Sequence, residues 1–160
     1  MKISGIKTFV VHCFRTNWVF VKVETDEGIH GIGEGTLEYK EHALIGAVQD
    51  LEHALVGKDP FDTAWIEHEN YRDAYWRGGA VLMSALSAID MALWDIKGKA
   101  LGVPCWKLLG GKCREKVPCY ANCWFVGAKE PEEFAAKATA AVERGFKGLK
   151  WDPFGKNYRQ

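Results

Sequence analysis

The sequence lacks an excess of charge of either sign. Its 160 residues include 21 Lys and Arg and 21 Asp and Glu, so the formal net charge at pH 7 is zero. A protein that is drawn to nucleic acid or to an anionic membrane by its overall field carries a basic excess. We therefore expect no nucleic-acid partner and no membrane partner, and a small-molecule ligand instead.

Long apolar runs are missing as well. No stretch approaches the roughly 20 consecutive apolar residues that span a bilayer. Residues 1–11 mix Lys2, Ser4, Gly5 and Lys7 with hydrophobic residues, which is unlike a secretory signal peptide. Both absences predict a cytoplasmic protein.

The cysteines form no Cys-x-x-Cys pair, and their number, five, is odd. This pattern fits neither a disulfide framework nor a zinc cage. We expect most of them to be reduced, packed thiols, and a catalytic thiol stays open as the alternative because no histidine partner is evident. They are Cys13, Cys105, Cys113, Cys119 and Cys123.

The first part of the chain has an α+β pattern. Valines alternate with other residues across a hairpin predicted for residues 17–35, and Ile3–Cys13 supplies another strand. Apolar residues at steps of three and four predict a helix over residues 44–55. A second helix is predicted from Asp59-Pro60 to Gly78-Gly79.

Residues 81–101 form the most apolar stretch and predict a central, buried helix. Asp90 and Asp95 interrupt it, and we expect both to be capped or surface-facing carboxylates without a catalytic role. A short helix follows Pro104. The glycines of Gly31-x-Gly33-x-Gly35 are spaced unlike a dinucleotide-binding loop, and no helix opens directly after them, so we set phosphate binding aside.

The pattern changes after Gly111. Residues 117–125 and 146–151 are strand-like and flank a helix that starts at Glu130-Pro131, which makes one βαβ unit. Parallel strands joined by a helix need more strands alongside and cover on both faces. We therefore predict a domain over residues 1–112, followed over residues 113–160 by the start of a TIM-type barrel that is truncated.

Several local strings resemble one known family. They are the hairpin string Val21 to Gly28 with Gly31-Ile32-Gly33-Glu34, the helix string Ser84 to Gly98, and Leu108-Leu109-Gly110-Gly111. They are similar to the enolase superfamily, in its mandelate racemase and muconate lactonizing branch. The resemblance implies an α+β capping domain (antiparallel sheet plus helices), followed by the first βαβ unit of an incomplete (β/α)8 barrel.

Residues 117–122 and 149–155 look most like acid-sugar dehydratases of the gluconate and galactonate type. Members of this branch remove the proton α to a carboxylate and hold the enediolate on Mg²⁺, and the dehydratases expel the β-hydroxyl to leave a 2-keto-3-deoxy acid. The resemblance thus implies an aldonate substrate and a homo-oligomer. The family's metal ligands come from later barrel strands, so we assign no metal ligand here and expect the 160-residue chain to be inactive.

Two residues match the family's motif at the second barrel strand. Lys150 corresponds to its first lysine, which helps to hold the substrate carboxylate or modulates proton transfer. Asp152 departs from the two-lysine pattern, which puts a lysine base in doubt and suggests contact with a substrate hydroxyl. The alternative is that both are exposed charges at a strand end.

The capping loops of the family close over the barrel mouth. The matching segments are residues 14–18 and the stretch after Glu34, so Arg15, Trp18 and Tyr39 become candidates for gripping a polyhydroxy acid. For Trp18 and Tyr39 the alternative is core packing, and for Arg15 it is a plain surface charge.

Two other functions stay open on sequence grounds. One is a racemase or cycloisomerase of the same branch, which only strands outside this chain would distinguish. The other is a stand-alone, non-catalytic module that uses its exposed strands to assemble with itself or with a partner.

Overall fold

The structure is a computed structural model that describes residues 1–13 and 16–153. The chain divides into two compact units, Met1–Lys112 and Cys113–Gln160.

The first unit contains a three-stranded antiparallel sheet in the order β1-β2-β3, with β1 at Ile3–Cys13, β2 at Thr16–Thr25 and β3 at His30–Glu34. The predicted hairpin and first strand are confirmed. Val19, Val21 and Val23 of β2 are fully buried on one face of the sheet, because side chains alternate along a strand.

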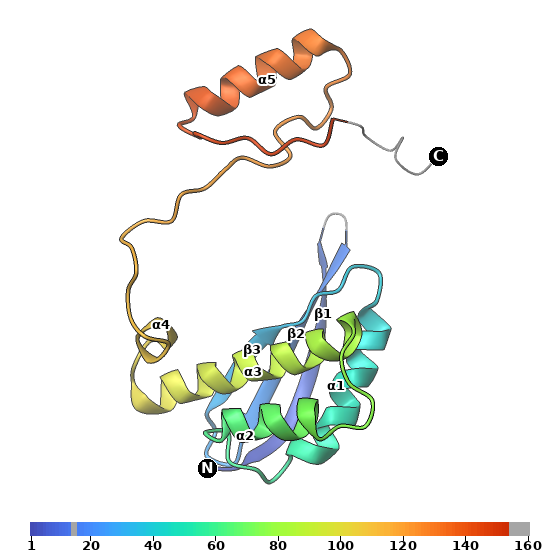
Figure 1. Ribbon diagram of the computed structural model, residues 1–160, viewed down its shortest axis with the longest axis vertical. Helices are drawn as coiled ribbons and strands as arrows, with labels where there is room; N and C mark the ends of the chain where they lie inside the picture. The colour runs from blue at the N-terminus through green and yellow to red at the C-terminus, as the bar shows by residue number, and fades with distance from the viewer. Residues whose placement is uncertain (14–15, 154–160) are drawn as a thin grey trace. The chain divides into compact units, whose positions relative to one another are not determined.

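Helices cover that face (Figure 1). Helix α1 (Glu41–Leu55) packs on β1, and α3 (Ala80–Leu101) packs on β3 and β2. The short α2 (Thr63–Glu67) contacts α3, and α4 (Cys105–Leu108) follows α3. The predicted central helix is confirmed, since Ile89, Leu93 and Ile96 are fully buried, although α3 also leaves Leu82 41% exposed.

The helix predicted after Asp59-Pro60 is shorter than expected. Asp59 Oδ1 accepts a hydrogen bond from Phe61 N, so Pro60 lies in a turn instead of the first helical turn. Helix α2 begins at Thr63, and a π-helical turn, η1 (His68–Arg72), ends the helical segment well before Gly78.

Helix α3 approaches β3 unusually closely because β3 presents glycines to it. A Cβ on Gly31 would lie 1.9 Å from the carbonyl oxygen of Ala92, and a Cβ on Gly33 would lie 1.8 Å from that of Ala88. Two strand residues rise about 6.6 Å and four helix residues about 6.0 Å, so the two repeats stay matched along the contact. These glycines therefore serve packing.

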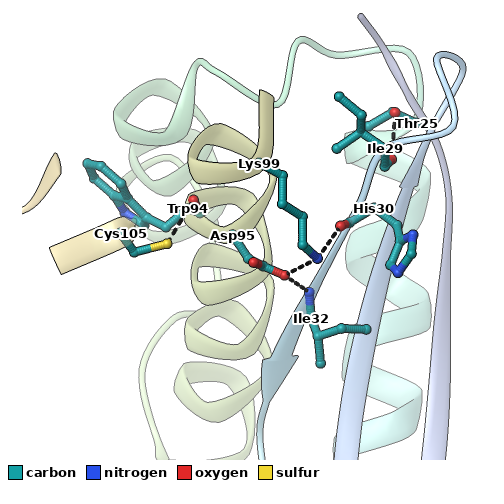
Figure 2. Close-up of polar contacts among 8 residues, drawn as sticks. All are labelled: Thr25, Ile29, His30, Ile32, Trp94, Asp95, Lys99 and Cys105. Carbon is teal, nitrogen blue, oxygen red and sulfur yellow. Dashed lines mark hydrogen bonds and ion pairs between the residues drawn. The ribbon is translucent and has the colours of Figure 1, made fainter. Parts of the chain in front are cut away.

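Side chains of helix α3 also form hydrogen bonds with backbone groups on the free edge of β3. Asp95 Oδ2 accepts a hydrogen bond from Ile32 N at 2.9 Å, and Lys99 Nζ donates to His30 O at 2.7 Å (Figure 2). Lys99 and Asp95 also pair with each other at 2.7 Å, one helical turn apart. An open strand edge is a template for pairing with other chains, and this pair of side chains occupies it.

The second unit contains α5 (Pro131–Glu143), which begins with a capping box between Glu130 and Glu133. A parallel bridge joins Ala121 to Leu149 on either side of α5, which gives the connectivity of a βαβ unit. The two predicted strands are much shorter than expected, because Trp124 and Phe125 already lie in a turn. A two-stranded parallel pair makes few ladder hydrogen bonds, so little holds longer strands together.

The cysteines correct another prediction. All five are free, but Cys113, Cys119 and Cys123 are exposed and none is fully buried, so packed thiols were the wrong expectation. Among the residues that the structure describes, no helix is long and apolar enough to cross a membrane.

Candidate active site

The segment that carries Lys150 and Asp152 lies in the second unit, directly after the parallel bridge. Ala121 N donates to Gly148 O at 2.9 Å, and Lys150 N donates to Ala121 O at 2.8 Å. Both Lys150 and Asp152 are exposed. Residues two apart in an extended segment point to the same side, so an ammonium and a carboxylate are presented together beyond the end of this strand.

Trp151, which lies between Lys150 and Asp152 in the sequence, belongs to an aromatic cluster. The ring of Trp151 is 6.0 Å from that of Trp124 and 5.4 Å from that of Phe134 on α5. These side chains, with Lys129, Pro131, Ala135 and Ala138, line an apolar hollow of about 410 Å³. Trp151 therefore faces α5, and its neighbours Lys150 and Asp152 are not among the residues that line this hollow.

The cap loop that follows Glu34 is tied to the start of β2. Gly35 N donates to Val19 O at 3.0 Å, and Val19 N donates to Thr36 Oγ1 at 3.1 Å. Thr36 Oγ1 in turn donates to Glu34 Oε1 at 2.7 Å. The stretch after Glu34 therefore lies beside Val19, the residue that follows Trp18.

The candidate residues of the cap that the structure describes, Trp18 and Tyr39, lie in different elements and are both exposed. Trp18 lies in β2, 43% exposed, with its ring edge-on to Phe20, and Tyr39 lies in the loop before α1, 68% exposed. Core packing is therefore excluded for both. Tyr39 has a φ of 63°, a left-handed conformation that is uncommon for a residue with a side chain. Arg15 lies outside the described residues.

Sequence reasoning missed polar residues next to these aromatic side chains. Asn17 Nδ2 donates to Glu41 Oε1 at 3.2 Å, and Asn17 Oδ1 lies 3.2 Å from His12 Nδ1. A hollow of about 400 Å³ beside the loop is lined by Glu34, Gly35, Thr36, Ala80, Met83, Ser84 and Ser87. Its hydroxyl and carboxylate groups suit a polyhydroxy ligand. No local motif signals the lining of this hollow, because the fold gathers it from two segments, residues 34–36 and 80–87.

The carboxyl group of Asp90 is perturbed but lies elsewhere. Burial raises its pKa, and the nearby Glu67 raises it further. Strongly shifted groups often mark active sites. Asp90 lies on α3 near Glu67 of α2, however, so it belongs to neither candidate segment.

The described residues do not supply the ligands of a metal ion. Within residues 1–13 and 16–153, no group of three or more His, Cys, Asp or Glu side chains is arranged to hold one. Mg²⁺ requires a near-octahedral set of oxygen ligands. Lys150 and Asp152 together offer one carboxylate, which does not fit such a site by itself.

The first unit is an α+β domain built on a three-stranded sheet, and the second is a βαβ unit with charged side chains beyond its second strand. This combination defines the class of protein. Residues 4–110 match the family described as mandelate racemase / muconate lactonizing enzyme, N-terminal domain. The chain belongs to this family, within the enolase superfamily.

Relatives match both units of the chain. It is 44% identical over 150 residues to a D-galactonate dehydratase of Pectobacterium atrosepticum, which covers 94% of this chain and 38% of the relative. A D-galactonate dehydratase of Variovorax paradoxus is 41% identical over 150 residues, with the same coverage. The chain thus spans about 38% of the length of these relatives.

Solved structures agree with this assignment. A member of the enolase superfamily from Salmonella Typhimurium has a TM-score of 0.88 at 40% identity, over 94% of this chain and 42% of that one. An enolase from Pantoea ananatis with bound D-gluconate and magnesium has a TM-score of 0.84 at 37% identity, over 92% of this chain and 35% of that one. The predicted family and fold class are confirmed.

Proposed function

We propose that this chain is the N-terminal part of an acid-sugar dehydratase that acts on an aldonate such as galactonate. The observation that carries this proposal is the match to D-galactonate dehydratases at 41–44% identity over about 150 residues. That match extends beyond the capping domain into the second unit, where Lys150 and Asp152 lie. Likeness to a structure that holds D-gluconate supports the same substrate class.

In this proposal residues 113–160 begin a TIM-type barrel, and Lys150 and Asp152 stand at the carboxyl end of its second strand. That end is where barrels of this type carry their chemistry. The Lys150 ammonium would hold the substrate carboxylate or assist proton transfer next to it. Asp152 would accept a hydrogen bond from a substrate hydroxyl.

The cap would contribute contacts to the rest of the sugar chain. Trp18 and Tyr39 are exposed, and the same unit carries the polar hollow at Thr36, so the cap offers both aromatic faces and hydroxyl groups. Aromatic faces pack on sugar carbons, and the hydroxyl groups fix orientation. Arg15 is proposed to pair with a carboxylate.

Magnesium would act in a longer protein, with ligands from outside this chain. A divalent cation supplies charge stabilisation to a developing enolate. The described residues do not supply its ligand set, so we derive no step through it.

The test joins residues 1–160 of this chain to the part of the Pectobacterium atrosepticum D-galactonate dehydratase beyond its matched segment. We expect this joined enzyme to convert D-galactonate to a 2-keto-3-deoxy acid in the presence of Mg²⁺. Lys150→Ala should lower kcat/KM by about a hundredfold or more, the range for a lost proton-transfer group. Lys147→Ala is the matched control, since Lys147 is also an exposed lysine but lies at a bend before the bridge residue Leu149.

Two results would contradict the proposal. One is a joined enzyme that folds and is active, in which Lys150→Ala and Lys147→Ala behave alike. The other is dehydration of aldonates by the purified 160-residue chain alone, which would place the complete catalytic set within these residues.

A further inference from the structure

Lys150 is held at both of its backbone polar groups by one short segment. Its N–H donates to Ala121 O at 2.8 Å, and its carbonyl oxygen accepts a hydrogen bond from the indole Nε1 of Trp124 at 2.8 Å. The second contact spans 26 residues of sequence and joins the ends of the βαβ unit. With both groups engaged, the peptide planes on either side of Lys150 cannot rotate freely, and the direction of its side chain is set.

A tight turn brings Trp124 back to this carbonyl. Cys123 adopts a φ of 56°, which is left-handed and unfavourable for a residue with a Cβ. The turn is held by Asn122 Oδ1, which accepts from Cys123 N at 2.8 Å, and by Val126 N, which donates to Cys123 O at 3.2 Å. A strained residue persists only where its surroundings impose it, often at functional positions.

Trp151, the residue after Lys150, is held by contacts with two aromatic rings. Trp151 packs between the ring of Trp124 and that of Phe134. Its side chain is therefore held towards α5. Because strand side chains alternate, this contact and the hydrogen bond to the carbonyl of Lys150 act together to send Lys150 and Asp152 to the opposite side.

We propose that Trp124 is a positioning residue for the catalytic strand end: its indole N–H holds the Lys150 carbonyl so that Lys150 and Asp152 project together towards the substrate. This inference rests on the proposed function, since it assumes that these two side chains meet substrate. Trp124 itself would touch no reacting atom. Its effect would pass through the backbone of Lys150.

The first experiment uses the 160-residue chain. Trp124→Phe keeps an aromatic ring in the cluster but removes the N–H donor, and Trp151→Phe is the matched control that changes a ring without touching this hydrogen bond. We expect the indole N–H of Trp124 to be protected from hydrogen exchange. Amide exchange at Lys150 should rise about fivefold in Trp124→Phe, because the lost hydrogen bond to the Lys150 carbonyl lets its N–H separate more often from Ala121 O. The rise should be smaller in Trp151→Phe. Equal exchange at Lys150 in the wild type and Trp124→Phe would overturn the inference.

The second experiment uses the joined enzyme described above. Trp124→Phe should lower kcat by tenfold to about a hundredfold with little change in KM, because misplacement of a reacting group costs rate more than binding. Trp151→Phe should retain most of kcat. An unchanged kcat in Trp124→Phe, with Lys150→Ala still inactive, would refute the positioning role and leave the proposed function standing. A fully active Lys150→Ala would instead remove the proposed role of Lys150, and with it the positioning role of Trp124, even if the exchange data show the hydrogen bond.

Discussion

Replacing Gly33 by Ala tests the closest contact in the first unit. The added Cβ would lie 1.8 Å from the carbonyl oxygen of Ala88, 2.8 Å from its carbonyl carbon and 3.2 Å from its Cα. These atoms belong to the backbone of α3, so no side chain can rotate away to make room. The φ of Gly33 is outside the left-handed region, and the cost therefore comes from the contact and not from backbone conformation.

The magnitude follows from the displacement that the contact demands. Real Cβ atoms do not approach closer than 3.0 Å, so strand and helix must separate by more than 1 Å at this point. Overpacking of a core costs 1–3 kcal/mol and sometimes more, and a rigid backbone contact belongs at the upper end. We expect a loss of about 3 kcal/mol, a large part of the 5–15 kcal/mol that stabilises an ordinary domain.

Urea unfolding followed by circular dichroism at 222 nm measures this loss, because α1 and α3 supply most of the helix in the first unit. Gly46→Ala is the matched control: Gly46 lies within α1 and its added Cβ would meet nothing within 4 Å. It should raise the free energy of unfolding by about 0.5–1 kcal/mol, since alanine is the better helix former. If Gly33→Ala proves as stable as the wild type, the close approach of α3 to β3 is wrong.

Three further predictions concern charged side chains of the first unit. Asp95→Ala should lower the free energy of unfolding by about 1 kcal/mol by freeing the Ile32 N–H, and Asp95→Asn should lose less, as chemical denaturation would show. Hydrogen bonds from two lysines lower the pKa of Glu24 to about 2, so its contribution is present above about pH 4.5 and lost as the pH falls towards 2; acid titration of Glu24→Gln should lack that loss. Burial, with Glu67, raises the pKa of Asp90, so its ionisation opposes folding and stability falls as the pH rises through the raised pKa; Asp90→Asn should show a smaller fall, and an equal fall would contradict this assignment.

Local patterns were sufficient for most elements of the fold. The valines of β2, the apolar faces of α1 and α3 and the Glu130-Pro131 start of α5 each lie within a few residues of one another, and each element was predicted correctly. Prediction failed at two places, for one local and one non-local reason. Asp59 turned Pro60 out of the helix through a side-chain hydrogen bond, and the two strands of the second unit shrank to one bridge because their pairing is weak.

The candidate site also contains residues that a local motif predicted and residues that only the fold brings together. Lys150 and Asp152 were predicted from a strand-end motif that resembles the family's, and both are exposed; their roles stay predictions. The polar hollow at Thr36, Ser84 and Ser87 was missed because its residues come from separate segments. The hydrogen bond on which the proposed role of Trp124 rests could not be predicted either, since the carbonyl that it holds is 26 residues away in sequence.

By itself, then, the sequence determined the α+β class of the first unit, the order of its helices and strands and the family, because periodicity and short motifs record local conformation. Only the tertiary structure decided what the glycines of β3 and the carboxylate of Asp95 do. Gly31 and Gly33 could have served a ligand, but α3 occupies the space above them. Asp95 satisfies a backbone N–H that lies 63 residues away in sequence, a pairing that exists only once α3 has packed on the sheet.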